Sequence, residues 1–189
     1  GTVDDGYPAP ITPNWHWPIE TVRFHVKILT EPNIAIDTMV ARMREVFARV
    51  GIGVRWVSTE ALDDLPLLND LDIGRCVLGS TTDEQDDLFA NREGARDSDV
   101  VIYFVRSTVP PSNGCASHPE GTPAGVVARG ATQWTLGHEV GHILDLRHVD
   151  DNDRLMTGNG TGNITNPPPE LVGSELATML SSPYTRDPF

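Results

Sequence analysis

The sequence predicts an α+β fold, in which a twisted mixed β-sheet carries helices and is followed by a small, loop-rich C-terminal lobe that ends in a helix. Three patterns support this prediction. Apolar and polar residues alternate over residues 21–30, which is typical of a half-buried strand. Apolar residues follow helical spacing over residues 36–50, which indicates an amphipathic helix. Residues 100–105 are continuously apolar, as in a central strand that is buried on both faces.

The 189 residues are expected to form one domain, because this length lies within the usual range for a single domain. Residues 1–20 are rich in proline and tryptophan and cannot form a regular helix, so we expect an extended N-terminal arm. Residues 21–148 are expected to form an N-terminal lobe, which holds the sheet with one helix behind it. Residues 149–189 are expected to form the C-terminal lobe.

The other elements follow from the same patterns. Gly51 stands where a C-terminal cap is expected for the helix at 36–50. Residues 60–97 show no clear period and predict a long irregular excursion with one short helix. Two further strands and two further helices are predicted, at residues 54–57, 124–129, 132–146 and 170–180. This order of elements implies a mixed sheet that carries helices.

The formal net charge of −13 excludes two classes of partner. Nucleic acids and anionic membranes bind basic surfaces, which this chain is not expected to present. No apolar run approaches the roughly 20 residues that are needed to cross a bilayer. We therefore expect no nucleic-acid partner and no membrane insertion. We also expect a secreted, monomeric protein.

Residues 137–148 carry the most informative motif, GHEVGHILDLRH. Residues four apart in a helix lie on one face, so His138 and His142 can bind one metal ion. Glu139 projects beside them and can reach a water molecule without being a ligand. This arrangement is typical of zinc-dependent hydrolysis, in which zinc lowers the pKa of bound water to about 7 and a carboxylate accepts the proton.

A catalytic zinc ion usually has three protein ligands, so a third is expected after His142. The candidates are Asp145 and His148. His148 reaches the metal only if the helix stops near Asp145 and the chain turns sharply, which requires a residue with positive φ. Asp tolerates that conformation better than most residues. We therefore interpret Asp145 as the turn residue and His148 as the third ligand.

The stretch from His138 to His148, with Met156 eight residues later, resembles the metzincin metalloproteases. Their signature is His-Glu-x-x-His-x-x-Gly-x-x-His, followed by a tight turn that holds a methionine beneath the zinc. The resemblance implies the same sheet-and-helix fold, Glu139 as general base and Met156 as the supporting methionine. Asp145 replaces the usual glycine, and Val149 matches none of the residues that mark the known branches, so no branch is assigned.

The resemblance also implies a substrate-binding strand. Gly125, Val126 and Val127 precede the predicted active-site helix, where such enzymes place an antiparallel edge strand that pairs with an extended substrate. An edge strand without a ligand is the alternative. The partner expected for this strand is a protein or peptide substrate.

Two further features leave alternatives open. Cys76 and Cys115 form either one disulfide, which would indicate an oxidising compartment, or two buried thiols, or they include a thiolate that binds the metal. The acidic run at residues 150–153 could bind Ca²⁺, but a solvated loop is the simpler interpretation.

The sequence therefore predicts a zinc-dependent endopeptidase that has Zn²⁺ as its cofactor. Two alternatives remain. The first is a catalytically silent zinc-containing module that only binds peptides, which the intact Glu139 disfavours. The second is a zinc hydrolase that acts on a non-protein amide.

Overall fold

The computed structural model describes residues 19–186 and confirms the α+β fold. The predicted N-terminal arm lies mostly outside the described residues. The main sheet has six strands in the order β3-β2-β5-β8-β7, and β9 pairs with β2. These strands are β2 (Glu20–Ile28), β3 (Ile52–Ala61), β5 (Val100–Val105), β7 (Gly114–Cys115), β8 (Ala124–Ala128) and β9 (Thr185–Arg186). The helices are α1 (Ile36–Ala48), α2 (Asp83–Phe89), α3 (Thr135–Ile143) and α4 (Gly173–Leu180).

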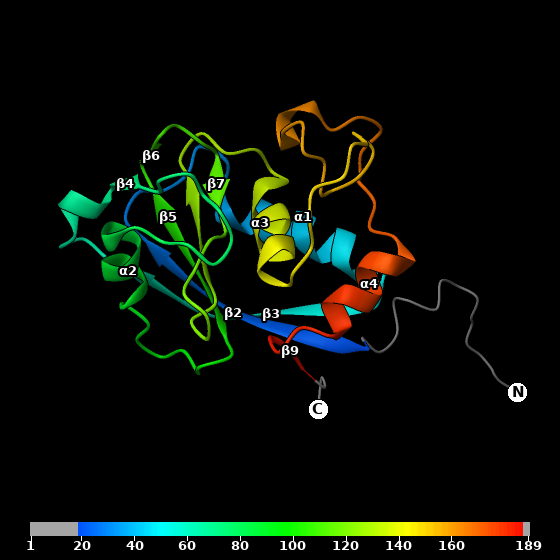
Figure 1. Ribbon diagram of the computed structural model, residues 1–189, viewed down its shortest axis with the longest axis horizontal. Coiled ribbons are helices and arrows are strands. Elements are labelled where there is room, and N and C mark those ends of the chain that lie inside the picture. The colour runs from blue at the N-terminus through cyan, green and yellow to red at the C-terminus, as the bar shows by residue number, and fades with distance from the viewer. Residues whose placement is uncertain (1–18, 187–189) are drawn as a thin grey trace, which may run out of the picture.

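The sheet is mixed, because β3, β2, β5 and β8 run parallel while β7 and β9 are antiparallel to their partners. Both of its faces are covered (Figure 1). Helices α1 and α3 cover one face, and α2 lies against the other. Every residue of β5 is buried, with Ile102 and Phe104 in one core and Val101, Tyr103 and Val105 in the other. This two-sided burial explains why the run at residues 100–105 is continuously apolar.

Helix α1 has the predicted amphipathic pattern and ends three residues before Gly51, which has a φ of 81°. Its apolar face packs against the sheet and against α3. The two helices meet at Gly137 of α3 and Met43 of α1, where a Cβ atom on Gly137 would lie at an ordinary contact distance of 3.5 Å from the Met43 Cβ. Within residues 19–186, no helix has the length and apolar character needed to span a bilayer.

The predicted excursion at residues 60–97 contains more order than its sequence pattern indicates. It includes a 3₁₀ turn (Pro66–Leu68), the strand β4 (Asp70–Asp72), which pairs with β6 (Ser107–Val109), and α2. Thr82 and Gln85 form a capping box that starts α2. A disulfide between Cys76 and Cys115 ties this excursion to β7, so the disulfide alternative holds and both thiol alternatives are wrong.

The prediction that the strand with Gly125, Val126 and Val127 forms an antiparallel edge of the sheet is wrong. Strand β8 lies between β5 and β7 and pairs with both. Gly125, Val126 and Val127 are buried, and the last two pair with β7. The edge is formed by β7 because the loop that precedes β8 folds back antiparallel to it. The substrate-binding role predicted for these three residues therefore loses its physical basis.

A buried polar network joins β2, β3 and the turn before β5. His25 contacts Ser58 through Nδ1 at 2.7 Å and Asp99 through Nε2 at 2.8 Å. Arg23 donates to the second oxygen of Asp99 at 3.1 Å. Burial by itself raises the pKa of Asp99, but hydrogen bonds from His25, the Arg96 main chain and Arg23 outweigh it and lower the pKa below its usual value. The network therefore satisfies a carboxylate that would otherwise be costly to bury.

Candidate metal centre

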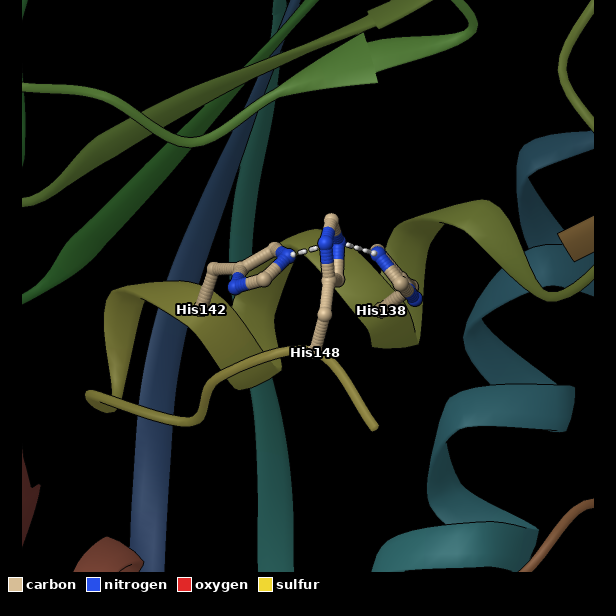
Figure 2. Close-up of side chains that lie close together, drawn as sticks. All are labelled: His138, His142 and His148. Carbon is tan, nitrogen blue, oxygen red and sulfur yellow. Dashed lines mark hydrogen bonds between the residues drawn. The ribbon is translucent and has the colours of Figure 1, made fainter. Parts of the chain in front are cut away.

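Three imidazole rings converge on one point, as Figure 2 shows. The Nε2 atom of His148 lies 3.3 Å from that of His138 and 3.0 Å from that of His142. Among residues 19–186, these three side chains are the cluster that could hold a metal ion, and their ligand atoms all lie within 4.8 Å of one another. The structure thus brings together the three residues that were predicted to hold zinc.

The end of α3 brings His148 to this point. The helix places His138 and His142 one turn apart and ends at Ile143. The main-chain N–H of Leu146 then donates to the Gly141 carbonyl at 3.0 Å, which closes the last turn. Asp145 has a φ of 74°, which lets the chain turn back after the helix. Its side chain is exposed and does not belong to the metal-ligating group.

The tautomers of His138 and His142 follow from the hydrogen-bond partners of their Nδ1 atoms. The Nδ1 atom of His138 lies 2.8 Å from the Leu155 carbonyl oxygen, and that of His142 lies 2.8 Å from the Leu146 carbonyl oxygen. A carbonyl oxygen only accepts, so each Nδ1 carries the proton and donates it. The Nε2 lone pair of each neutral ring is then free and points to the shared centre. Such an orienting hydrogen bond is the usual partner of a metal-binding histidine.

These contacts fit a cation better than a hydrogen-bonded group. His148 could donate through Nε2 to only one of the two neighbouring lone pairs, so one close N···N contact would stay unfavourable. Tetrahedral coordination with Zn–N bonds of about 2.0–2.1 Å places two ligand nitrogens about 3.3 Å apart. The two distances that involve His148 are close to this value, and all three ligand atoms lie within 4.8 Å of one another. Three histidines also leave a fourth position open, as in catalytic zinc sites.

The electrostatics favour the ligand forms of the histidines. Burial lowers the pKa of His138, and the nearby His148 lowers it further. Burial and the neighbouring His138 lower the pKa of His142 to about 4. Both rings are therefore neutral at pH 7, which is the state that binds a metal.

Glu139 lines the same cleft as the histidines, with its side chain largely buried. Its side chain is buried, and burial raises its pKa to about 8. A neighbouring cation acts in the opposite direction, because it favours the ionised carboxylate. The carboxylate packs against Gly114 of β7, where a Cβ atom would lie 2.8 Å from the Glu139 Oε2. Only glycine therefore lets the edge strand pass this close to Glu139.

Met156 packs against the metal-ligating helix α3 at Gly141. It is fully buried, and its Sδ lies 2.6 Å from the position that a Cβ atom on Gly141 would occupy. The Val149 N–H donates to the Met156 carbonyl at 2.9 Å, and the Gly158 N–H donates to the Val149 carbonyl at 2.9 Å. These bonds tie the segment after His148 to the segment that carries Met156.

A cleft of about 650 Å³ opens over the three histidines and Glu139. The edge strand β7 and the loop before it form one wall. The disulfide-linked turn at residues 73–78 and the segment at residues 157–161 complete the cleft. Sequence reasoning missed the close approaches at Gly114 and Gly141. For Gly141 a signal was available, because a glycine between two metal ligands on a helix indicates a close neighbour. For Gly114 there was no such signal, because it lies far from Glu139 in the sequence.

The acidic run at residues 150–153 does not support a Ca²⁺ site. Asp153 accepts hydrogen bonds from Thr165 and Asn166. Asp150 accepts one from Asn159, and none of the run belongs to the metal-ligating group found among residues 19–186. The local hydrogen bonds account for this loop.

Comparison with solved structures shows that the chain has the fold of zinc metallopeptidases. It resembles metalloproteinase-II from Bacteroides fragilis, with a TM-score of 0.62 and 19% identity over 87% of this chain, but it covers only 53% of that chain. It also resembles archaemetzincin from Methanopyrus kandleri, with a TM-score of 0.52, 16% identity and coverage of 85% and 94% of the two chains. A zinc-dependent peptidase from Methanocorpusculum labreanum matches with a TM-score of 0.53 and 12% identity, over 82% of this chain and 99% of that one.

At these identities the likeness concerns the fold, and no metzincin branch is assigned by it. No protein-family model matches the sequence, and no curated protein matches it significantly.

Proposed function

We propose that the protein is a zinc-dependent endopeptidase. The observation that carries this proposal is the convergence of three Nε2 atoms, two of them with lone pairs set by main-chain carbonyls, next to the buried carboxyl of Glu139. The solved structures that share the fold support it, since their names describe zinc-dependent or metal-dependent peptidases.

Each residue has a distinct role in this proposal. His138, His142 and His148 hold zinc, which supplies Lewis acidity for hydrolysis at neutral pH. Glu139 accepts a proton from the attacking water and returns it to the leaving amine. The burial of Glu139 lowers the local dielectric constant and strengthens its electrostatic interactions with the reacting groups. Met156 supports the helix from below and touches none of the reacting atoms.

The edge strand β7 is the proposed site of substrate pairing. It ends the sheet and pairs on one side only, with β8, within the described residues. An extended peptide can add to such an edge through main-chain hydrogen bonds, which explains binding with little dependence on side chains. Since Gly114 contacts Glu139, a peptide paired with β7 passes beside the general base.

The two alternatives make different demands on Glu139. A module that only binds peptides needs no general base, and burying a carboxyl that has no hydrogen-bond partner among residues 19–186 would destabilise it without benefit. A hydrolase of non-protein amides needs the base but gains nothing from an open sheet edge. The disulfide between Cys76 and Cys115 supports a further part of the proposal, that the protein is secreted into an oxidising compartment. We also propose that it acts as a monomer.

The test combines zinc content with cleavage of an unfolded protein, for wild type, Glu139→Gln and the matched control Glu120→Gln. Glu120 is exposed and lies outside the cleft. We expect one zinc per chain in all three proteins. Cleavage should fall by about 10²–10⁴-fold in Glu139→Gln alone, which is the range for loss of a general base. Full activity in Glu139→Gln, or wild type that binds no zinc, would refute the proposal.

A further inference from the structure

The cleft differs in charge from the rest of the protein. The chain has 27 acidic and 14 basic residues, so its surface is strongly acidic. The residues that line the cleft include two arginines, Arg75 and Arg147, and a single carboxylate, Glu139, which the proposed reaction already uses. A carboxylate-poor, arginine-bearing cleft in an acidic protein concentrates positive potential where the substrate binds.

Neither arginine forms an ion pair within the part of the chain that the structure describes. Five Arg or Lys side chains form ion pairs with carboxylates among residues 19–186, and Arg75 and Arg147 are not among them. Both side chains are exposed, and neither donates a hydrogen bond within the described part of the chain. Their guanidinium groups are therefore available to a ligand, and zinc in the site would add to the same positive potential.

The main chain at Arg75 is fixed on both sides. The Gly74 N–H donates to the Asp72 carboxylate at 2.9 Å, and the Cys76 N–H donates to the Ile73 carbonyl at 3.1 Å. The disulfide then joins Cys76 to the edge strand β7. Arg75 thus stands on a closed turn that is covalently linked to the wall where we place the substrate.

The main chain at Arg147 is fixed by the metal centre itself. The preceding residue, Leu146, is buried, and its carbonyl accepts the hydrogen bond that orients His142. The following residue, His148, belongs to the histidine group. The main chain of Arg147 therefore cannot move away from the cleft without displacing groups that the metal centre requires.

We propose that the cleft selects peptides that carry a carboxylate close to the scissile bond, and that Arg75 and Arg147 bind this carboxylate. The inference rests on the proposed peptidase function and names its substrate class. Arginine binds carboxylates through paired, charge-assisted hydrogen bonds, which gives geometric selectivity as well as attraction. The carboxylate belongs either to an acidic side chain or to a peptide C-terminus, and the two sources are distinguished by experiment.

The experiment uses zinc-loaded protein and fluorogenic peptides that differ at one position near the scissile bond. The position holds Glu, Gln or Lys, with both termini blocked, and a neutral peptide with a free or an amidated C-terminus forms the second arm. The variants are Arg75→Gln, Arg147→Gln and the double variant. Arg55→Gln is the matched control, because Arg55 is exposed on β3 at the opposite edge of the sheet. Zinc content is measured for each protein.

In wild type we expect kcat/KM to be higher for Glu than for Gln by roughly two- to fivefold for each arginine that is engaged, the range for solvent-exposed ion pairs. The ratio of kcat/KM for the Glu peptide to that for the Gln peptide should fall to about 1 in the double variant and should persist in Arg55→Gln. In wild type this ratio should decrease as salt is added. Arg147→Glu should reverse the preference towards Lys. An equal Glu-to-Gln ratio in wild type and in the double variant, in both arms, would overturn the inference.

A binding measurement separates this inference from the proposed function. The same peptides are titrated into zinc-loaded Glu139→Gln, and fluorescence anisotropy reports their affinity without cleavage. Tighter binding of acidic peptides that depends on the two arginines would support the inference even if wild type cleaved nothing. Cleavage by wild type with no carboxylate preference in either measurement would leave the peptidase proposal intact and refute the role of the arginines.

Discussion

The contact between Gly141 and Met156 yields the sharpest prediction about the metal-ligating helix. In Gly141→Ala the new Cβ atom would lie 2.6 Å from Met156 Sδ and 3.3 Å from its Cε. Met156 is fully buried, so its side chain has little room in which to move. Overpacking of this kind costs about 1–3 kcal/mol. Alanine is favoured over glycine in a helix by about 1 kcal/mol. The net loss of stability should therefore be about 0–2 kcal/mol.

The sign should reverse once the methionine is removed. In a Met156→Ala background the close contact is absent, and Gly141→Ala should then stabilise the protein by about 1 kcal/mol. Met156→Ala itself should cost about 2–5 kcal/mol, as for other buried large-to-small changes. The coupling free energy between the two positions should thus be about 1–3 kcal/mol.

Gly137→Ala provides the matched control on the same helix. A Cβ atom there would meet only ordinary contacts with Met43, at 3.5–3.6 Å. This substitution should be neutral or stabilising by up to about 1 kcal/mol, to the same extent with and without Met156.

The assay is urea-induced unfolding followed by circular dichroism, with the disulfide intact and zinc at one fixed concentration, because a bound metal shifts the apparent stability. Zinc content is measured in parallel. If Gly141→Ala changed the free energy of unfolding equally in both backgrounds, the methionine would not pack against the helix as described and the reasoning would be refuted.

Three further predictions concern other parts of the chain. Because Asp145 has a φ of 74°, Asp145→Ala should destabilise by about 1–2 kcal/mol in urea unfolding while Asp145→Gly should not, and equal effects would contradict its role in the turn. The disulfide partners are separated by 39 residues, so Cys76→Ser with Cys115→Ser should lower the free energy of unfolding by up to about 4 kcal/mol in the same assay. The lowered pKa of Asp99 contributes stability above its unfolded pKa of about 3.9 that is lost as the pH falls through the folded value. Asp99→Asn should therefore reduce stability at pH 7 and flatten the acid limb of the stability profile, and an unchanged acid limb would count against this linkage.

Local patterns were enough to predict several elements. The pair His138 and His142 depends on the period of one helix, and the continuous burial of β5 depends on one run of apolar residues. The positive φ at Asp145 follows from its tolerance of that conformation and from the need to turn towards His148. In each case the information lies within a few residues, so the sequence alone was sufficient.

Contacts between distant segments decided the rest. The edge of the sheet depends on which strands pair, and β7 takes this place only because its loop folds back on β8. For the same reason the sequence did not show that Gly114 would contact Glu139, or that a disulfide would hold Arg75 at the cleft. The sequence by itself determined the active-site helix, the four parallel strands of the main sheet and the candidate ligands, because periodicity and backbone preference act locally. Only the tertiary structure decided which strand and which charged side chains border the site, because strand order and side-chain proximity depend on the packing of the whole chain.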